Sequence, residues 1–270
     1  MKTATGNRMT PQDISWEERC KVVKEAGFDG VEMWIGTEDF DMESTDDDLK
    51  RLNNGIQAAG LEVSSVASTM GWNNPICSPD DAVFNRALEI GKRQIQVAGI
   101  FGTDATLVVT GRHDASVDQL EGWKRIVSGF QELGQVAADA GVRVGAETCP
   151  KLSFNLMTPY ECLGFVEDVG MDSVGIYLDT ANVTYSGYPE HFIRALGDRI
   201  VRIHFKDRIE TPDGRGGATW PGNGVVNFGP VMDACREIGH DAWATMEYGT
   251  PHTLETMSEA ASSTRAIVDG

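Results

Sequence analysis

The stretch "SVGIYLDTANVTYSGYPEHFIRALGDRIVRIHFKD", residues 173–207, contains one complete strand–helix–strand unit. The apolar runs at 173–179 and 200–207 predict buried strands, and the amphipathic pattern at 188–198 between them predicts a helix. Two strands joined through a helix pair in parallel, because the helix carries the chain back along the sheet. This stretch therefore predicts an α/β fold built on a parallel sheet.

The same alternation extends over the whole chain and gives about eight strand–helix units, the number in a closed (β/α)8 barrel of roughly 250 residues. Strands are expected at 2–5, 30–35, 61–68, 105–111, 142–147, 173–179, 200–207 and 242–248, and helices at 15–27, 45–60, 78–102, 118–141, 158–170, 188–198, 228–239 and 253–268. A doubly wound open sheet is the competing fold. It would favour a glycine-rich phosphate loop after the first strand, and no G-x-G-x-x-G or Walker sequence occurs there. With no compositional break in the chain, we expect residues 1–270 to form a single TIM-barrel domain, an α/β fold.

Composition narrows the classes of function. The formal net charge of −18 over 270 residues opposes binding to nucleic acid and to anionic membranes. No stretch approaches the 18 apolar residues of a membrane span, and no signal peptide is evident. The five cysteines are scattered without a C-x-x-C pair, which favours free thiols and a cytoplasmic location.

Four ligand-type side chains occupy the ends of four successive predicted strands: Glu147, Asp179, His204 and Glu247. Each has an ordinary explanation by itself, as a helix cap, a core histidine or a partner of arginine. Function in a barrel collects at the carboxyl ends of the strands, so the four should converge. Three carboxylates and an imidazole suit Mn²⁺, Mg²⁺ or Co²⁺, with Zn²⁺ as an alternative, and a cation would compensate their buried charge.

Several motifs resemble those of the sugar phosphate isomerase/epimerase superfamily, the xylose isomerase-like TIM barrels. They are "GFDGVEMW", "GAETCP", "YLDTANV", "VRIHFKDR", "WPGNGVVNFGPVMDACREIG" and "ATMEYG", and they run from about residue 20 to the end of the chain. The resemblance implies a divalent metal held by Glu147, Asp179, His204 and Glu247. In the ketose 3-epimerases of that superfamily the two glutamates also act as the acid/base pair, which here implies Glu147 and Glu247.

This chemistry is physically coherent. A proton on carbon next to a carbonyl is weakly acidic, and a divalent cation stabilises the enediolate that its removal produces. Epimerisation requires one group to remove the proton and another to return one on the opposite face of the substrate. Glu147 and Glu247 are the residues we expect to do so.

Five further residues are candidates for contact with a substrate. Lys206 shares strand parity with His204, and it either holds a substrate oxygen or phosphate or forms a salt bridge to a ligand carboxylate. Asn182 occupies the position at which several ketose epimerases of the superfamily that this chain resembles have a substrate-binding histidine. Other members of that superfamily share the D-x-x-N pattern seen here. Trp34 and Trp72 follow strand ends, and their rings could pack against an apolar face of a sugar. Simple packing within the protein is the alternative. Arg112 lies after the fourth strand, where a surface loop is the alternative.

The sequence therefore predicts a metal-dependent isomerase or epimerase acting on a ketose or keto-polyol through a metal-stabilised enediolate. The alternatives are a dehydratase or a C-glycoside-cleaving lyase with the same enolate chemistry, or an inert sugar-binding subunit. The DNA-repair branch of the superfamily, the endonuclease-IV-like proteins, builds a three-metal site from extra histidines. Five histidines and a charge of −18 argue against it. We expect a small sugar or polyol as partner and association into a homo-oligomer, as is frequent among the barrels that the chain resembles.

Overall fold

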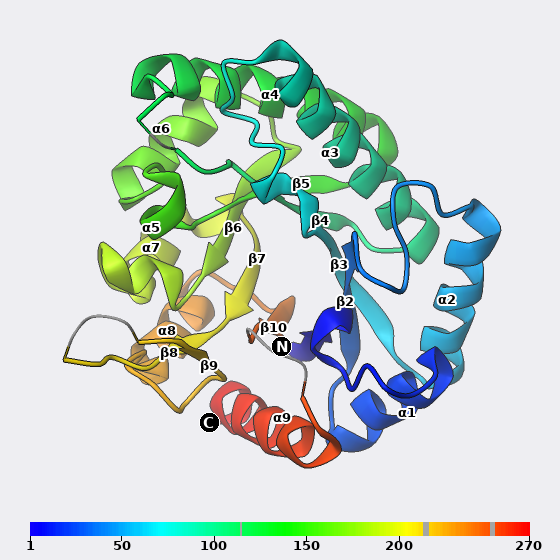
Figure 1. The fold of residues 1–270 in the computed structure, drawn as a ribbon. Helices are drawn as coiled ribbons and strands as arrows, with labels where there is room; N and C mark the ends of the chain where they lie inside the picture. The colour runs from blue at the N-terminus through cyan, green and yellow to red at the C-terminus, as the bar shows by residue number, and fades with distance from the viewer. Residues whose placement is uncertain (114, 213–215, 249–251) are drawn as a thin grey trace.

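The computed structural model describes residues 1–270 except 114, 213–215 and 249–251. Eight parallel strands close into a barrel in the order β1-β10-β7-β6-β5-β4-β3-β2 (Figure 1). They are β1 (Lys2–Gly6), β2 (Gly30–Ile35), β3 (Glu62–Ser68), β4 (Ala105–Val109), β5 (Arg143–Glu147), β6 (Val174–Asp179), β7 (Ile200–Phe205) and β10 (Trp243–Met246). This confirms the predicted (β/α)8 fold over the open sheet.

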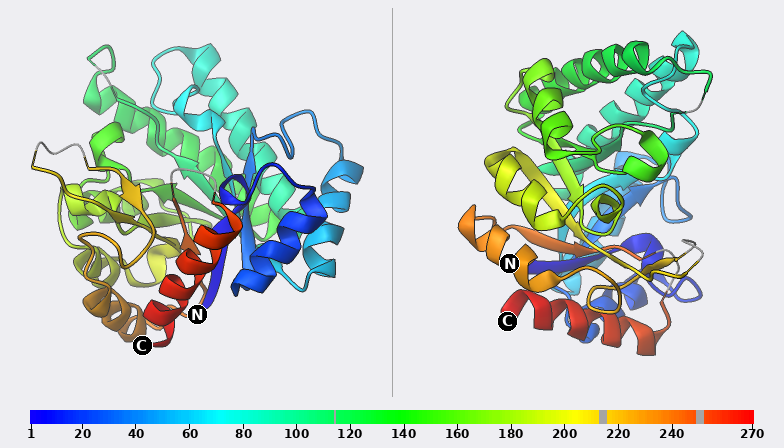
Figure 2. Two further views of the ribbon diagram at one scale, coloured as in Figure 1. Left: turned by 60° about the horizontal axis from the view of Figure 1, so that its bottom comes forward. Right: turned by 90° about the vertical axis from the view of Figure 1, so that its left-hand side faces the viewer.

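Helices surround the barrel, and the last of them, α9, lies beside α1 and the first strand (Figure 2). The helices are α1 (Trp16–Ala26), α2 (Asp46–Ala58), α3 (Asp81–Phe101), α4 (Gln119–Ala140), α5 (Pro150–Ser153), α6 (Pro159–Val169), α7 (Pro189–Leu196), α8 (Phe228–Glu237) and α9 (Leu254–Asp269). Capping boxes, in which a hydroxyl and a carboxylate satisfy the first backbone N–H groups, begin several of them, including α1, α2 and α6. Left-handed Gly27 ends α1, as the sequence indicates.

Several short elements were not expected from the sequence, among them helix α5 and a pair of short strands. The strand predicted at 200–207 divides, because β7 ends at Phe205 and Asp207 begins a separate strand, β8 (Asp207–Arg208). The antiparallel partner of β8 is β9 (Ala218–Thr219), so this pair forms a small ribbon outside the barrel. The ribbon lies beyond the carboxyl end of β7, on the face of the barrel where the candidate ligands lie.

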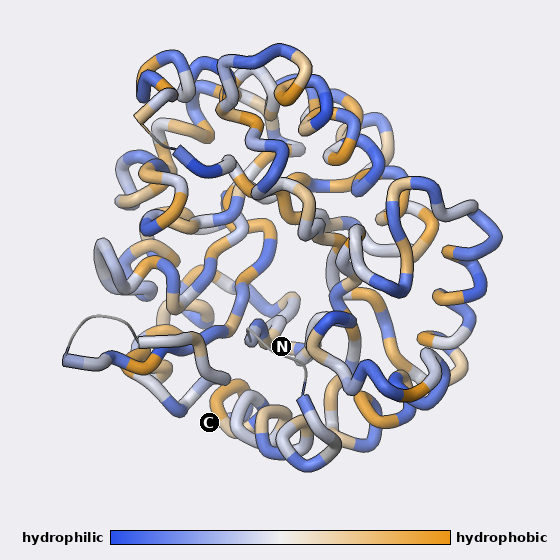
Figure 3. Tube along the Cα trace, viewed as in Figure 1, coloured by the Kyte–Doolittle hydropathy of each residue, from blue (hydrophilic) through white to orange (hydrophobic). Residues whose placement is uncertain are grey.

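Apolar side chains form two layers. The larger fills the space between the strands and the helices, and the smaller lies inside the barrel and contains Trp34, Ala67, Leu107, Val109 and Tyr177. The outer helices alternate between hydrophilic and hydrophobic residues along the chain, as expected for helices that cover a barrel (Figure 3). Polar side chains are also buried among the strands, and they supply the candidate site.

All five cysteines are buried as thiols outside any disulfide, as their scattered positions in the sequence predict. In the part of the chain that the structure describes, every helix is too short or too polar to cross a bilayer.

Candidate metal and acid–base site

The four predicted ligands meet at the carboxyl end of the barrel. Glu147 and Asp179 are the last residues of β5 and β6, His204 lies in β7, and Glu247 directly follows β10. One ligand atom from each of the four lies within 4.8 Å of the others, and all four side chains are buried. Parallel strands end at the same edge, so residues from four neighbouring strands form one cluster.

Two atoms of the cluster are buried without a hydrogen-bond partner among the described residues. They are Asp179 Oδ2 and His204 Nδ1. His204 Nδ1 lies 3.4 Å from a carboxylate oxygen of Glu247, and Asp179 Oδ2 lies 3.3 Å from Lys206 Nζ. Buried polar atoms normally have hydrogen-bond partners, and two atoms that have only these longer ionic contacts within a group of carboxylates fit the donor set of a divalent cation.

Two basic side chains hold the carboxylates from outside the ligand set. Lys206 Nζ lies 2.9 Å from Glu247 Oε2, and the Arg8 guanidinium lies 2.7 Å from Glu247 Oε1. Arg8 also stacks on the Trp34 ring, 4.3 Å from its centroid. Glu247 is thus fixed at both oxygens before any substrate arrives.

The pKa values of the three carboxylates diverge. Burial raises the pKa of Glu147 to about 8, and the negative charge of Glu247 adds to this effect. Burial also raises the pKa of Asp179 to about 6, against the attraction of Lys206. Burial acts on Glu247 too, but the positive charges of Lys206 and His204 hold its pKa well below the usual range. The protein therefore cannot ionise all three at neutral pH unaided, and a divalent cation would supply the missing positive charge.

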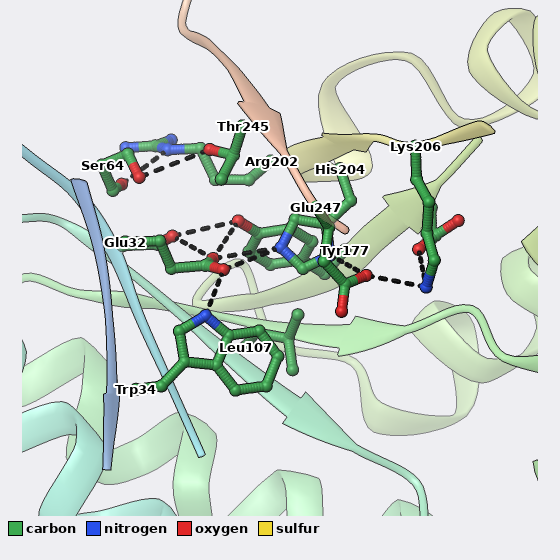
Figure 4. A network of polar contacts seen from close by, with 12 residues as sticks. Glu32, Trp34, Ser64, Leu107, Tyr177, Arg202, His204, Lys206, Thr245 and Glu247 are labelled. Atoms are coloured by element: carbon green, nitrogen blue, oxygen red, sulfur yellow. Dashed lines mark hydrogen bonds and ion pairs between the residues drawn. The ribbon is translucent and has the colours of Figure 1, made fainter. Parts of the chain in front are cut away.

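Behind the cluster, inside the barrel, lies a fourth carboxylate, Glu32 of β2. It is fully buried and accepts hydrogen bonds from Trp34, Tyr177 and His204, from 2.7 Å to 3.2 Å (Figure 4). Ser65 donates a further hydrogen bond at 2.7 Å. Burial opposes its ionisation, but the charge of His204 lowers the pKa of Glu32. Glu32 therefore holds the ring of His204 from the side opposite the metal-ligand cluster.

The structure brings some of the predicted substrate residues towards this site. Lys206 forms salt bridges to ligand carboxylates, which is the alternative that the sequence left open. Asn182 donates its backbone N–H to Asp179 Oδ1 at 2.7 Å and its side-chain amide to Thr148 at 3.1 Å. Contact of Lys206 and Asn182 with a substrate stays a prediction.

The two tryptophans that the sequence predicted to contact a sugar, Trp34 and Trp72, lie largely inside the protein. Trp34 is buried, and its ring stacks 6.3 Å from that of His204, while Trp72 packs partly buried against the same inner cluster. Arg112 is exposed after β4, and its backbone oxygen accepts a hydrogen bond from Cys77. A substrate contact by any of Trp34, Trp72 and Arg112 also stays a prediction.

Sequence reasoning missed Glu32, Tyr177 and Arg8. A signal for Glu32 existed, since "GVEMWI" places a carboxylate in a strand interior two residues from Trp34. Arg8 gave no signal, because it lies in a short 3₁₀ turn after β1.

Asp207 organises the loop that follows β7. Its carboxylate accepts backbone N–H groups from Arg208, Gly222, Gly224 and Val226, at 2.8 Å to 3.2 Å. The segment 220–226 is thereby held at the mouth of the barrel, beside Lys206.

The chain is similar to several known proteins. The xylose isomerase-like TIM barrel family matches residues 20–267. L-ribulose-5-phosphate 3-epimerase of Escherichia coli (strain K12) is 27% identical over 272 residues, covering 96% of this chain and 88% of that protein. Among solved structures, an L-ribulose 3-epimerase superposes with a TM-score of 0.82 at 21% identity, over 99% of this chain and 93% of the other. D-psicose 3-epimerase does so with 0.80 at 19% identity, over 100% of both chains. The 3-keto-D-glucoside 4-epimerase of E. coli does so with 0.81 at 17% identity, over 98% of this chain and 99% of the other.

Proposed function

Because the chain belongs to the xylose isomerase-like TIM barrel family, we propose that it is a divalent-metal-dependent sugar epimerase or isomerase acting on a ketose or keto-polyol. The observation that carries this proposal is the buried cluster of Glu147, Asp179, His204 and Glu247, in which two donor atoms make only the longer ionic contacts described above. The similarity to sugar epimerases supports the same reaction class. Mn²⁺, Mg²⁺ and Co²⁺ are the cations that the donor set favours.

In this proposal, Glu147, Asp179, His204 and Glu247 would hold the cation, which would supply the positive charge that makes a proton next to a carbonyl easier to remove. The chain's own residues move the proton. Glu147 and Glu247 extend from β5 and β10, which two other strands separate in the barrel, so they approach a substrate from different sides. One removes the proton on one face and the other delivers a proton to the opposite face.

The two glutamates suit different parts of this task. Without a cation, burial raises the pKa of Glu147 to about 8. Glu247 is kept ionised and immobile by Lys206 and Arg8. Carboxylates whose environments push their pKa values apart are typical of acid/base pairs.

Solvent isotope exchange tests the proposal. Protein loaded with Mn²⁺ or Mg²⁺ is incubated in deuterated water with L-ribulose 5-phosphate, L-ribulose, D-psicose, keto-inositols and a 3-keto-glucoside, and followed by NMR. We expect deuterium at one carbon together with an accumulating epimer or isomer, and no exchange by Glu147→Gln. Exchange followed by elimination would identify a dehydratase or lyase instead. Tight metal binding without any exchange would favour an inert sugar-binding subunit.

The free, buried thiols and the acidic charge also favour a cytoplasmic location for this enzyme. Its association into a homo-oligomer is a prediction that sedimentation would test.

A further inference from the structure

Glu32 belongs to none of the roles proposed so far, yet it contacts one of the four ligands directly. Its Oε2 and Oε1 lie 3.0 Å and 3.2 Å from His204 Nε2. The other ring nitrogen of that histidine, Nδ1, is the atom in the longer ionic contact with Glu247. The imidazole of His204 thus lies between the barrel interior and the cluster. Its Nε2 contacts Glu32, and its Nδ1 faces Glu247 and the cluster.

The contact with Glu32 decides which nitrogen is available to a cation. In the metal-free protein His204 lies between the carboxylates of Glu32 and Glu247 and carries a positive charge. A cation at the cluster would displace the proton of Nδ1, and the remaining proton stays on Nε2, because the carboxylate of Glu32 can only accept. Nδ1 then keeps its lone pair and faces the ligand cluster. Second-layer carboxylates on ligand histidines fix the tautomer and the orientation of the ring in this way.

The carboxylate of Glu32 is itself held in place by further hydrogen bonds. Trp34 Nε1 donates to Oε2 at 2.8 Å, while the hydroxyls of Ser65 and Tyr177 each donate to Oε1 at 2.7 Å. These donors come from β2, β3 and β6, so several strands hold the carboxylate together. A buried network that is fully satisfied is rigid, and it transmits that rigidity to the histidine.

We propose that Glu32 is the positioning residue of the metal site, holding His204 in the Nε2–H tautomer with Nδ1 aimed at the cation. This inference rests on the proposed metal dependence. It predicts that Glu32 controls metal affinity without touching the metal. A carboxylate that only fills the barrel interior would leave that affinity unchanged.

The first test uses the intact wild-type protein. It is labelled with ¹⁵N at histidine and loaded with ¹¹³Cd²⁺, and the cadmium–nitrogen coupling identifies the coordinating atom. We expect coupling to Nδ1 of His204. Coupling to Nε2 would overturn the inference, because Glu32 could not then hold that nitrogen.

The second test compares two variants of similar size to the wild type. Glu32→Gln keeps the shape but loses the charge that orients the histidine, whereas Thr106→Val removes a buried hydrogen bond to the backbone of Val66, which is outside the network around Glu32. Affinity for Mn²⁺ is measured by electron paramagnetic resonance, with circular dichroism as the check on folding. We expect Glu32→Gln to bind Mn²⁺ about 10–100-fold more weakly, as loss of such a partner typically does, and Thr106→Val to stay within about threefold of the wild type.

Other outcomes would refute either the role of Glu32 or the metal dependence itself. Equal affinity in Glu32→Gln and the wild type would refute the role of Glu32 and leave the metal site standing. Equal weakening in both variants would also refute it, since the loss of affinity would then reflect packing alone. A wild type that binds neither cation would refute the proposed metal dependence together with the inference. If Glu32→Gln fails to fold, the cadmium coupling alone decides.

Discussion

Arg8 reaches Glu247, one of the two proposed acid/base glutamates, from the other end of the chain. Its guanidinium hydrogen-bonds Glu247 and stacks on Trp34, so it both fixes the carboxylate and covers the inner aromatic residue. Arg8→Met keeps an aliphatic cover over the ring but removes the charge. A charge-assisted hydrogen bond is worth roughly 1.5–3 kcal/mol, so we expect kcat/KM to fall about 10–100-fold.

Steady-state kinetics on the substrate identified by isotope exchange would measure this effect. Arg86→Met is the matched control, because Arg86 pairs only with exposed Glu89 among the described residues. Activity of Arg8→Met within about threefold of the control would show that Lys206 alone is sufficient to hold Glu247.

Glu147 makes the stability of the metal-free protein depend on pH. Its pKa is about 8 in the folded protein against an ordinary value of 4.5, so between these values the folded state keeps a proton that the unfolded chain has lost. The free energy of unfolding therefore falls as the pH rises from about 4.5 to 8. Glu147→Gln removes this penalty, and we expect it to be more stable than the wild type at pH 8.5 by about 1–3 kcal/mol.

Urea unfolding at pH 5, 6.5 and 8.5 in the presence of a chelator would test this sign. Asp179 contributes a smaller slope of the same sign, so the variant should keep some pH dependence. Glu89→Gln, an exposed substitution, serves as the reference. A Glu147→Gln variant that loses stability at pH 8.5 would contradict the raised pKa.

At the scale of the element, the loop after β7 depends on one carboxylate. Asp207 accepts four backbone N–H groups, and Gly224 approaches it so closely that an added Cβ would lie 2.3 Å from Asp207 Oδ1. We expect Asp207→Ala to lower the free energy of unfolding by about 2–4 kcal/mol, since it leaves several of these donors unpaired. Gly224→Ala should destabilise the loop as well.

Denaturant titration would measure both effects. Gly99→Ala, at an exposed position of helix α3, is the control, because its Cβ would meet no atom within 4 Å and alanine favours a helix. If Asp207→Ala unfolds at the same denaturant concentration as this control, the loop is held by other contacts.

The elements also explain what the sequence could and could not predict. Glu147, Asp179 and Glu247 stand at or next to strand ends, and the alternation of strands and helices was sufficient to bring them together with His204. Side-chain direction across the barrel is less predictable. The register between β2 and β3 shifts between Val31 and Glu32. Only the closed barrel then places the side chain of Glu32 opposite His204.

For the molecule as a whole, the cation should be a source of stability. Carboxylates and an imidazole that face one another in the folded protein are dispersed in the unfolded chain, so a cation that binds the folded form stabilises it. At a free metal concentration of 100 times Kd we expect about 2.7 kcal/mol, equivalent to a rise in Tm of about 5–10 °C. Thermal unfolding with Mn²⁺ and with a chelator measures the difference, and Asp179→Asn should abolish most of it. An unchanged Tm after verified metal binding would mean that the unfolded chain binds the cation equally well.

The barrel closes by pairing its first strand with its last. β1 lies against β10, and the bond from Arg8 to Glu247 spans 239 residues of sequence at this seam. During synthesis on the ribosome, the first seven strands therefore emerge with Arg8 unpaired and the fourth ligand missing. The four-residue cluster is therefore complete only when the final strand leaves the exit tunnel and docks. In the proposed site, a nascent chain that stalls before this point would present three of the four ligands and lack the second glutamate of the acid/base pair.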